Sequence, residues 1–368
     1  MRTSAQSKFA FSFQLYLLTF AAFWLLLATT LAGQSSAPPA PGPKPSDIPQ
    51  VWKPWIGEYG ASPDNQNTGT AFALSEKDGS IVLLLRTRKS DEAEYQLIQR
   101  FSSDTAPNGA DPRLQLRVGA SGKRVLVIDA LENQKLSPDA NATTQVAIKP
   151  VKPIDELRRD ALSASPPQES GPFRKAELVE LASLDAAIHL EIRYATTNDF
   201  LGTPVYTQAR AFMQRPAAEA LVRALNKLKP LGYGLLIHDA YRPWYVTKIF
   251  WDATPPEGKI FVADPSQGSR HNRGCAVDLT LYDLASGKPI EMPGTYDEMS
   301  PRSFPDYPGG TSLQRWHRDL LRRAMESEGF TVYEHEWWHF DYKDWHEYPI
   351  LNIKFEDLHS GQGLASAQ

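Results

Sequence analysis

Two side chains able to bind a metal ion lie close together in the segment Ser269–Asp278, which contains His271 and Asp278. Zinc binds imidazole nitrogen and carboxylate oxygen at about 2.0–2.2 Å, and a catalytic zinc site takes three protein ligands and keeps one position for water. Gly274 lies between the two residues and allows a tight turn. The segment therefore predicts two of the three ligands. Taken alone, it also fits a histidine that caps a loop and an aspartate in a surface ion pair.

A second segment, Glu334–Phe340, offers both the third ligand and a general base. We choose His339 as the ligand and Glu336 as the base, because a carboxylate beside a metal-activated water can take its proton and pass it to a leaving amine. Residues three apart on an ideal strand point to opposite faces, so a bulge or a strand end must bring the pair together. Glu334 and His335 are the competing choices.

The segment His238–Pro243 adds a guanidinium, Arg242, just after an apolar run that is typical of a strand. At a strand end this cation can polarise a scissile carbonyl and stabilise the oxyanion. By itself, an arginine here fits a salt bridge equally well. The three segments together predict a hydrolytic site built around one metal ion.

Bulk composition limits the kinds of protein and partner to consider. The chain has 368 residues, of which 42% are hydrophobic and 22% charged, so it is globular with room for two domains. A formal net charge of -4 provides no basic field for nucleic acid, and we expect a small substrate instead. The single cysteine, Cys275, excludes an intramolecular disulfide and a Cys-rich metal site.

The amino terminus has the features of an export signal over residues 1–32, because Arg2 and Lys8 precede a long apolar run. Cleavage after Ala32 would leave residues 33–50 as a Pro/Ser-rich tether. The apolar run also approaches the roughly 20 residues that span a bilayer, so an uncleaved anchor is the alternative. Either way, we expect an exported protein, periplasmic or anchored in the membrane and facing the periplasm, with membrane contact only if the segment is uncleaved.

Residues 51–130 alternate short apolar runs with turn residues such as Asp78-Gly79, which predicts a small β-rich domain. We expect Trp52, Trp55 and Tyr59 to fill its core rather than to form a binding surface. No catalytic constellation is found there. The expected strands are Thr70–Leu74, Ile81–Thr87, Tyr95–Phe101, Leu114–Val118 and Val125–Asp129.

A shift to Pro, Ser, Ala and mixed charge marks residues 131–171 as a linker that holds one short helix, and residues 172–360 as the catalytic domain. Strand and helix patterns occur there in mixed order, which predicts an α+β fold with a central antiparallel sheet flanked by helices. The expected strands are Leu178–Leu181, His189–Tyr194, Leu235–His238 and Thr331–Tyr342, and the expected helices are Pro216–Leu228, Trp244–Ala253 and Ser312–Glu328.

Four segments of this domain resemble the D-alanyl-D-alanine dipeptidase family in residue type, order and spacing. They are Arg193-Tyr194-Ala195-Thr196, Asp239-Ala240-Tyr241-Arg242-Pro243, Ser269–Asp278 with the following Leu279-Thr280-Leu281-Tyr282, and Glu336-Trp337-Trp338-His339. The resemblance covers about residues 178–349 and excludes the β-rich front part. It implies hydrolysis of the D-Ala-D-Ala dipeptide, with one Zn²⁺ ion held by His271, Asp278 and His339, and with Glu336 as base and Arg242 as carbonyl polariser.

Three further assignments come from the resemblance alone. It implies that Asp297 binds the free amino group of the substrate and that Tyr194 and Ser269 line the pocket. Capture of an amino terminus by a carboxylate would explain why a dipeptide is cut rather than a long peptide. The chain departs from the family in carrying Cys275, an export signal and a front domain. An exported dipeptidase cannot drain a cytoplasmic pool of D-Ala-D-Ala, so we expect scavenging or cell-wall peptide turnover rather than glycopeptide resistance.

Two other functions stay open from the sequence. The nearer one is a zinc D-Ala-D-Ala carboxypeptidase or endopeptidase that acts on longer peptidoglycan peptides, with the front domain as a wall-binding module. The length of the preferred substrate separates it from a dipeptidase. The more distant one is a non-catalytic, zinc-stabilised binding protein. Glu336 beside a complete ligand set argues against it, since a structural site needs no base.

Overall fold

The structure is a computed structural model in which the residues from 40 onward belong to one compact unit. It describes residues 40–60, 71–89, 92–104, 114–119, 122–128, 131–136, 148–298 and 300–358. The expected export signal, residues 1–32, lies outside this range. Among the described residues, no helix is both long enough and apolar enough to cross a membrane.

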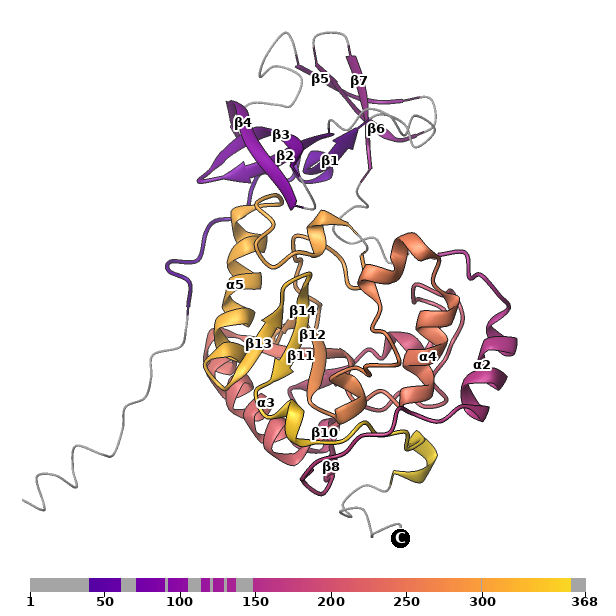
Figure 1. The fold of residues 1–368 in the computed structure, drawn as a ribbon. Coiled ribbons are helices and arrows are strands. Elements are labelled where there is room, and N and C mark those ends of the chain that lie inside the picture. The colour runs from indigo at the N-terminus through magenta and orange to yellow at the C-terminus, as the bar shows by residue number, and fades with distance from the viewer. Residues whose placement is uncertain are drawn as a thin grey trace, which may run out of the picture. The chain divides into compact units, whose positions relative to one another are not determined.

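The front part of the chain forms one antiparallel sheet of seven strands, in the order β4-β3-β2-β1-β7-β6-β5 (Figure 1). The five strands expected from the sequence correspond to β2 to β6, and β1 and β7 complete the sheet. The strands are β1 (Gly57–Gly60), β2 (Ala71–Lys77), β3 (Ser80–Lys89), β4 (Glu92–Ser102), β5 (Leu114–Val118), β6 (Arg124–Ile128) and β7 (Leu131–Lys135).

Turn chemistry and apolar side chains explain this sheet. Asp78 and Gly79 join β2 to β3 with φ angles of 51° and 74°, the left-handed pair that a tight two-residue hairpin requires. Trp52 and Tyr59 are fully buried in the apolar cluster of the sheet, and Trp55 packs against it. These aromatic residues therefore belong to the core, as expected.

The segment expected to be a linker is partly packed. The sheet continues to Lys135, because β7 pairs with both β6 and β1, whereas we expected the β-rich part to end at residue 130. The expected short helix is α2 (Ile154–Ser163). It buries Ile154, Leu157 and Ala161 in the core of the catalytic part.

The catalytic part is built on a five-stranded sheet in the order β13-β14-β12-β11-β9. Only the pairing of β9 with β11 is parallel among these strands, so the expected α+β fold with a mainly antiparallel central sheet is confirmed. The strands are β9 (Ile188–Leu190), β11 (Tyr233–Asp239), β12 (Ala276–Asp283), β13 (Phe330–Tyr333) and β14 (Glu336–Tyr342), and a separate two-stranded sheet pairs β8 (Leu178–Glu180) with β10 (Phe212–Gln214).

Three helices flank this sheet. The helices α3 (Arg215–Leu228) and α5 (Ser312–Glu326) pack against each other and against its strands, and α4 (Trp244–Ala253) packs against α2 (Figure 1). A capping box between Thr311 and Gln314 starts α5, which satisfies backbone donors at its first turn. The apolar faces of α3 and α5 join the strands in one core.

One expected strand is wrong in the structure. Residues 331–342 form a β-hairpin rather than a single central strand, with Glu334 and His335 in the turn between β13 and β14. The turn contains no Gly, Pro, Asn or Asp, so the residues that usually signal a turn are missing. The extended run expected over residues 189–194 also ends early, in a 3-10 turn at Arg193–Ala195.

Short 3-10 helices connect the remaining segments. They are η1 (Lys53–Trp55), η3 (Leu181–Ser183), η4 (Arg193–Ala195), η5 (Lys229–Leu231), η6 (Pro256–Phe261), η7 (His271–Arg273), η8 (Pro301–Ser303), η9 (Trp345–Glu347) and η10 (Phe355–Asp357).

Candidate active site

Strand register aligns three polar side chains across the catalytic sheet. Asp278 of β12 lies directly opposite His339 of β14 and is paired on its other side with Asp239 of β11. Residues that face each other on antiparallel strands carry their side chains on the same face, about 5 Å apart. Long-range pairing therefore brings together residues that are distant in the sequence.

A tight turn adds His271 to this row. The residue begins η7, and Gly274 ends that turn with a φ of 69°. A β-carbon at Gly274 would lie 2.5 Å from Cδ2 of Leu178, so both the conformation and the space require glycine. The backbone N–H of Arg242 donates to the carbonyl of His271 at 3.1 Å and ties the turn to the end of β11.

Three ligand atoms face one another in the resulting cluster. His271 Nε2, His339 Nδ1 and Asp278 Oδ1 are separated by 3.1, 3.4 and 3.0 Å. His271 Nδ1 lies 2.6 Å from the carbonyl of Ala240, and His339 Nε2 lies 2.9 Å from Asp341 Oδ1. These acceptors favour the tautomer with the proton on the outer nitrogen of each ring, which leaves the inner nitrogens able to bind a metal ion.

The cluster fits a metal ion. Two ligands at about 2.0–2.1 Å from a tetrahedral ion lie about 3.3 Å apart, which agrees with the observed separations. Asp278 Oδ1 is buried and accepts no hydrogen bond from the described residues. Three lone-pair donors at this spacing repel one another unless a cation lies between them. His271, Asp278 and His339 are also the group of described residues whose donor atoms are arranged to hold a metal ion.

Glu336 lies beside the ligands at the first position of β14. Its Oε2 is 3.8 Å from His339 Nδ1, although the two residues are three apart on the strand. In a regular strand, side chains three residues apart point to opposite faces. This rule does not apply here, because Glu336 lies at the strand end and the register is irregular at Tyr333. Burial raises the pKa of Glu336 to about 7. The rival Glu334 is exposed and lies in the hairpin turn, and His335 packs between Phe304 and Tyr333.

Arg242 is held rigidly at the end of β11. Its Nε and one terminal nitrogen both donate to Asp239 Oδ2, at 2.9 and 2.8 Å. The hydroxyl of Tyr206 donates to the other oxygen of Asp239 at 2.6 Å. The guanidinium also lies over the rings of Tyr194 and Phe250, and one of its nitrogens is 4.0 Å from Asp278 Oδ2. The arrangement points a fixed cation toward the ligand cluster.

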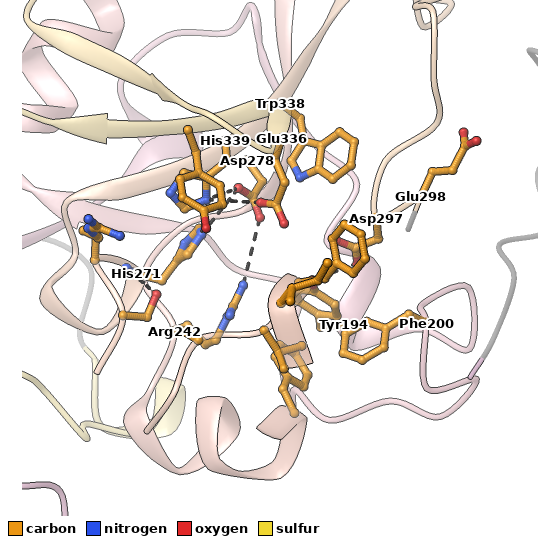
Figure 2. Close-up of a pocket in the computed structure, with 18 of the residues that line it drawn as sticks. Tyr194, Phe200, Arg242, His271, Asp278, Asp297, Glu298, Glu336, Trp338 and His339 are labelled. Carbon is orange, nitrogen blue, oxygen red and sulfur yellow. Dashed lines mark hydrogen bonds and ion pairs between the residues drawn. The ribbon is translucent and has the colours of Figure 1, made fainter. Parts of the chain in front are cut away.

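All eight candidate residues from the sequence line one cavity of about 230 Å³. Figure 2 shows the metal ligands and Glu336 gathered on one side of Arg242, and Tyr194 and Asp297 on the other. Ser269 reaches the same cavity from the loop before η7, where its hydroxyl accepts the backbone N–H of His271 at 3.2 Å. The full set is Tyr194, Arg242, Ser269, His271, Asp278, Asp297, Glu336 and His339.

A chain of hydrogen bonds links the ligand cluster to Asp297. The hydroxyl of Tyr296 lies 3.1 Å from Asp278 Oδ2 and 3.0 Å from the hydroxyl of Tyr194. Tyr194 in turn donates to Asp297 Oδ2 at 2.8 Å. Burial, together with the charges of Asp278 and Glu336, raises the pKa of Asp297 well above its ordinary value. An ammonium group in the cavity would therefore find a carboxylate that gains from a positive partner.

Sequence reasoning missed three residues of this site. Asp341 orients His339, and its position two residues further along the strand places it on the same face, a spacing that could have identified it. Asp239 was part of the Arg242 motif but had no role assigned. Tyr296 carries no comparable signal, because it lies in a long loop without periodicity.

The arrangement brings together a group able to hold a metal ion, a buried carboxylate and a fixed cation, the parts that metal-assisted hydrolysis requires. A family model described as D-ala-D-ala dipeptidase matches residues 174–359. The chain is 35% identical over 179 residues to the D-alanyl-D-alanine dipeptidase of Escherichia coli, a match that covers 49% of this chain and 91% of that protein. It is 35% identical over 196 residues to the enzyme of the same name from Enterococcus faecalis, covering 47% of this chain and 95% of that protein.

A third relative is the D-alanyl-D-alanine dipeptidase of Streptomyces coelicolor, at 34% identity over 44% of this chain and 89% of that protein. The chain belongs to the D-Ala-D-Ala dipeptidase family and is a metallopeptidase. The family match begins at residue 174, so the sheet of β1 to β7 lies before it.

Proposed function

We propose that this protein hydrolyses D-Ala-D-Ala to two molecules of D-alanine with one zinc ion. The convergence of His271, Asp278 and His339, with Glu336 3.8 Å from His339, carries the proposal. Three relatives named D-alanyl-D-alanine dipeptidase support the choice of substrate. Two imidazoles and one carboxylate form a donor set that suits zinc.

Each residue of the chain then has a defined task. Zinc held by the three ligands would supply a Lewis acid and lower the pKa of water to about 7. Glu336 takes the proton of the attacking water and gives it to the leaving amine. Arg242, immobilised by Asp239, polarises the scissile carbonyl and stabilises the oxyanion with a charge that needs no reorganisation.

Asp297 makes the site prefer a dipeptide over longer peptides. Its carboxylate binds the ammonium group of the substrate, and the hydrogen bond from Tyr194 keeps it at the cavity. A peptide extended at its amino end would leave this buried carboxylate without a cation, which costs free energy. Ser269 and Tyr194 line the cavity around the dipeptide.

The export segment gives the proposal its biological setting. With residues 1–32 acting as a signal or an anchor, the enzyme works in the periplasm or at the periplasmic face of the membrane, on peptides released by cell-wall turnover or taken up by scavenging. Fractionation of cells that produce the full chain tests the location. Glycopeptide resistance conferred on a sensitive host by the exported form would contradict this role.

The length of the preferred substrate tests the activity. We expect the purified protein to release D-alanine from D-Ala-D-Ala and to act at least about 100-fold more slowly on a wall pentapeptide ending in D-Ala-D-Ala. A site whose buried polar group is left unpaired can discriminate by about 10⁴-fold, so this is a lower bound. Faster cleavage of the pentapeptide would instead identify a carboxypeptidase. Activity on neither peptide would favour a binding protein.

A further inference from the structure

The loop between β12 and α5 carries Asp297 to the cavity, and its conformation at this residue is strained. Asp297 has a φ of 56°, in the left-handed region that residues with a β-carbon seldom occupy. Such a residue keeps its conformation only where its surroundings hold it there. The contacts of residues 289–311, which we call the 289–311 loop, show what holds it.

Part of the support lies inside the loop. The carboxylate of Glu298 accepts hydrogen bonds from the backbone N–H of Thr295 at 2.9 Å and from the hydroxyl of Ser300 at 2.7 Å. Arg302 donates from Nε to the carbonyl of Pro293 at 2.9 Å. These bonds close the turn around Asp297, but they do not attach it to the rest of the molecule.

Besides the hydrogen bonds of Asp297 and Tyr296 at the cavity, the loop is attached to β1. Tyr307 donates to Glu58 Oε1 at 2.7 Å, and Tyr95 of β4 donates to the same oxygen at 2.9 Å. Glu58 and Tyr307 are 5% and 2% exposed, so the hydrogen bonds to this carboxylate are shielded from water. The rings of Tyr95 and Tyr307 meet edge to face at 5.8 Å. The position of Tyr307 is therefore fixed by a residue of the front sheet.

The second attachment joins the end of the loop to β2. The carbonyl of Gly310 accepts hydrogen bonds from the hydroxyl of Ser75 at 2.7 Å and from the backbone N–H of Glu76 at 2.9 Å. The carboxylate of Glu76 accepts the backbone N–H and the hydroxyl of Ser312, at 2.5 and 3.1 Å. A carboxylate at the first turn of α5 is also favoured by the helix dipole.

We propose that the sheet of β1 to β7 is a positioning element for substrate recognition, in which Glu58 and Glu76 hold the 289–311 loop so that Asp297 meets the substrate ammonium. This inference rests on the role proposed for Asp297. The metal ligands lie on η7, β12 and β14, outside the loop, which contacts Asp278 through the hydroxyl of Tyr296. Loosening the loop therefore weakens binding of the amino group and leaves the hydrolytic step largely intact. Glu58 and Tyr307 are positioning residues that act through Asp297.

Steady-state kinetics of Tyr307→Phe in the full chain tests the proposal. We expect the KM for D-Ala-D-Ala to rise about tenfold, as for loss of a hydrogen bond to a charged group, and kcat to change less than twofold. Glu58→Gln weakens the same bond from the side of the sheet, and we expect a smaller rise in KM. The matched control is Tyr95→Phe, which removes the other hydroxyl on Glu58 Oε1 but keeps the ring packed on Tyr307 and the hydrogen bond from Tyr307 to Glu58. It should lower the Tm but leave KM within twofold.

A double-mutant cycle separates positioning from a general loss of stability. In an Asp297→Asn background, Tyr307→Phe should change KM less than twofold, because its effect passes through Asp297. An equal rise in KM in both backgrounds, or no rise in either, would overturn the proposal.

Hydrogen exchange of the amides in the 289–311 loop gives a readout that needs no substrate. We expect faster exchange in Tyr307→Phe than in Tyr95→Phe, and unchanged exchange in Tyr307→Phe would refute the positioning role. If the parent protein fails to cleave the dipeptide while this difference in exchange is present, the proposed function fails and the attachment of the loop stands.

Discussion

Asp341 is the carboxylate that orients His339, and replacing it by asparagine tests the geometry of the metal site. In Asp341→Asn the side chain keeps nearly the same shape and can still accept the hydrogen bond to His339 Nε2, which is 2.9 Å long. The negative charge is lost. The corresponding partner of His271 is the backbone carbonyl of Ala240, which a side-chain substitution does not remove. Asp341 is therefore the hydrogen-bond partner that a mutation can change.

The expected loss of zinc affinity follows from the type of hydrogen bond. A bond to an ionised acceptor is roughly twice as strong as a neutral one, and the difference of about 1–1.5 kcal/mol corresponds to about tenfold in binding. Changes in the partners of metal-ligating histidines typically cost 10–100-fold in affinity. We therefore expect the zinc affinity of Asp341→Asn to fall at least tenfold, with little change in secondary structure.

Competition with a chromophoric chelator measures this affinity directly. The matched control is Asp344→Asn, because Asp344 is a nearby carboxylate that pairs with Arg174 at 3.4 Å instead. We expect the control to bind zinc within twofold of the parent protein. An affinity of Asp341→Asn equal to that of the control would refute the argument that the outer contact on His339 shapes the metal site.

Three further predictions concern the cation, the turn and the response to acid. Arg242→Lys cannot reproduce the two hydrogen bonds to Asp239, and we expect kcat to fall about 100-fold with an unchanged circular dichroism spectrum. Gly274→Ala forces a β-carbon against Leu178 at a positive φ, and we expect urea denaturation to show a loss of about 3 kcal/mol; an unchanged midpoint would contradict the close approach. Burial, aided by the charge of Lys44, lowers the pKa of His317 to about 4. The unfolded chain binds this proton near pH 6.5, so folding stability falls as the pH drops from 6.5 to 4.5, by about 2–3 kcal/mol from this group. In His317→Gln we expect a correspondingly flatter dependence on pH, and an equally steep one would exclude His317 as the cause.

The residues that meet at the cavity could be identified from the sequence because they occur in short, dense segments. His271 and Asp278 are separated by a turn that needs glycine, and Glu336 and His339 lie on one strand. Their mutual distances could not be predicted, since they depend on the pairing of β12 with β14 and of β12 with β11. Such register is a long-range property that no local pattern encodes.

The wrong strand assignment has a local physical cause. The hairpin of β13 and β14 was expected as one strand, because its turn at Glu334 and His335 lacks the residues that usually mark turns. The same turn places Glu336 at a strand end, so its side chain reaches His339 although the two residues are three apart on the strand. The 289–311 loop could not be predicted, since its conformation depends on Glu58 and Glu76, residues more than 200 positions earlier in the chain.

The front sheet is attached to the part of the chain that matches the family. The family match covers residues 174–359, yet buried polar contacts connect β1 and β2 to a loop inside this range. A module that only bound cell walls would not need to hold the loop that carries Asp297. Removal of the front sheet should therefore weaken binding of the dipeptide.

The release of D-alanine from D-Ala-D-Ala by the purified protein and by Glu336→Gln, each before and after chelation and zinc replacement, is the most direct test of the account. We predict activity that is lost on chelation and restored by zinc in the parent protein, and at least 1,000-fold weaker in Glu336→Gln, which keeps all three ligands but cannot move the proton. Activity that survives chelation, or that is unaffected by Glu336→Gln, would contradict it.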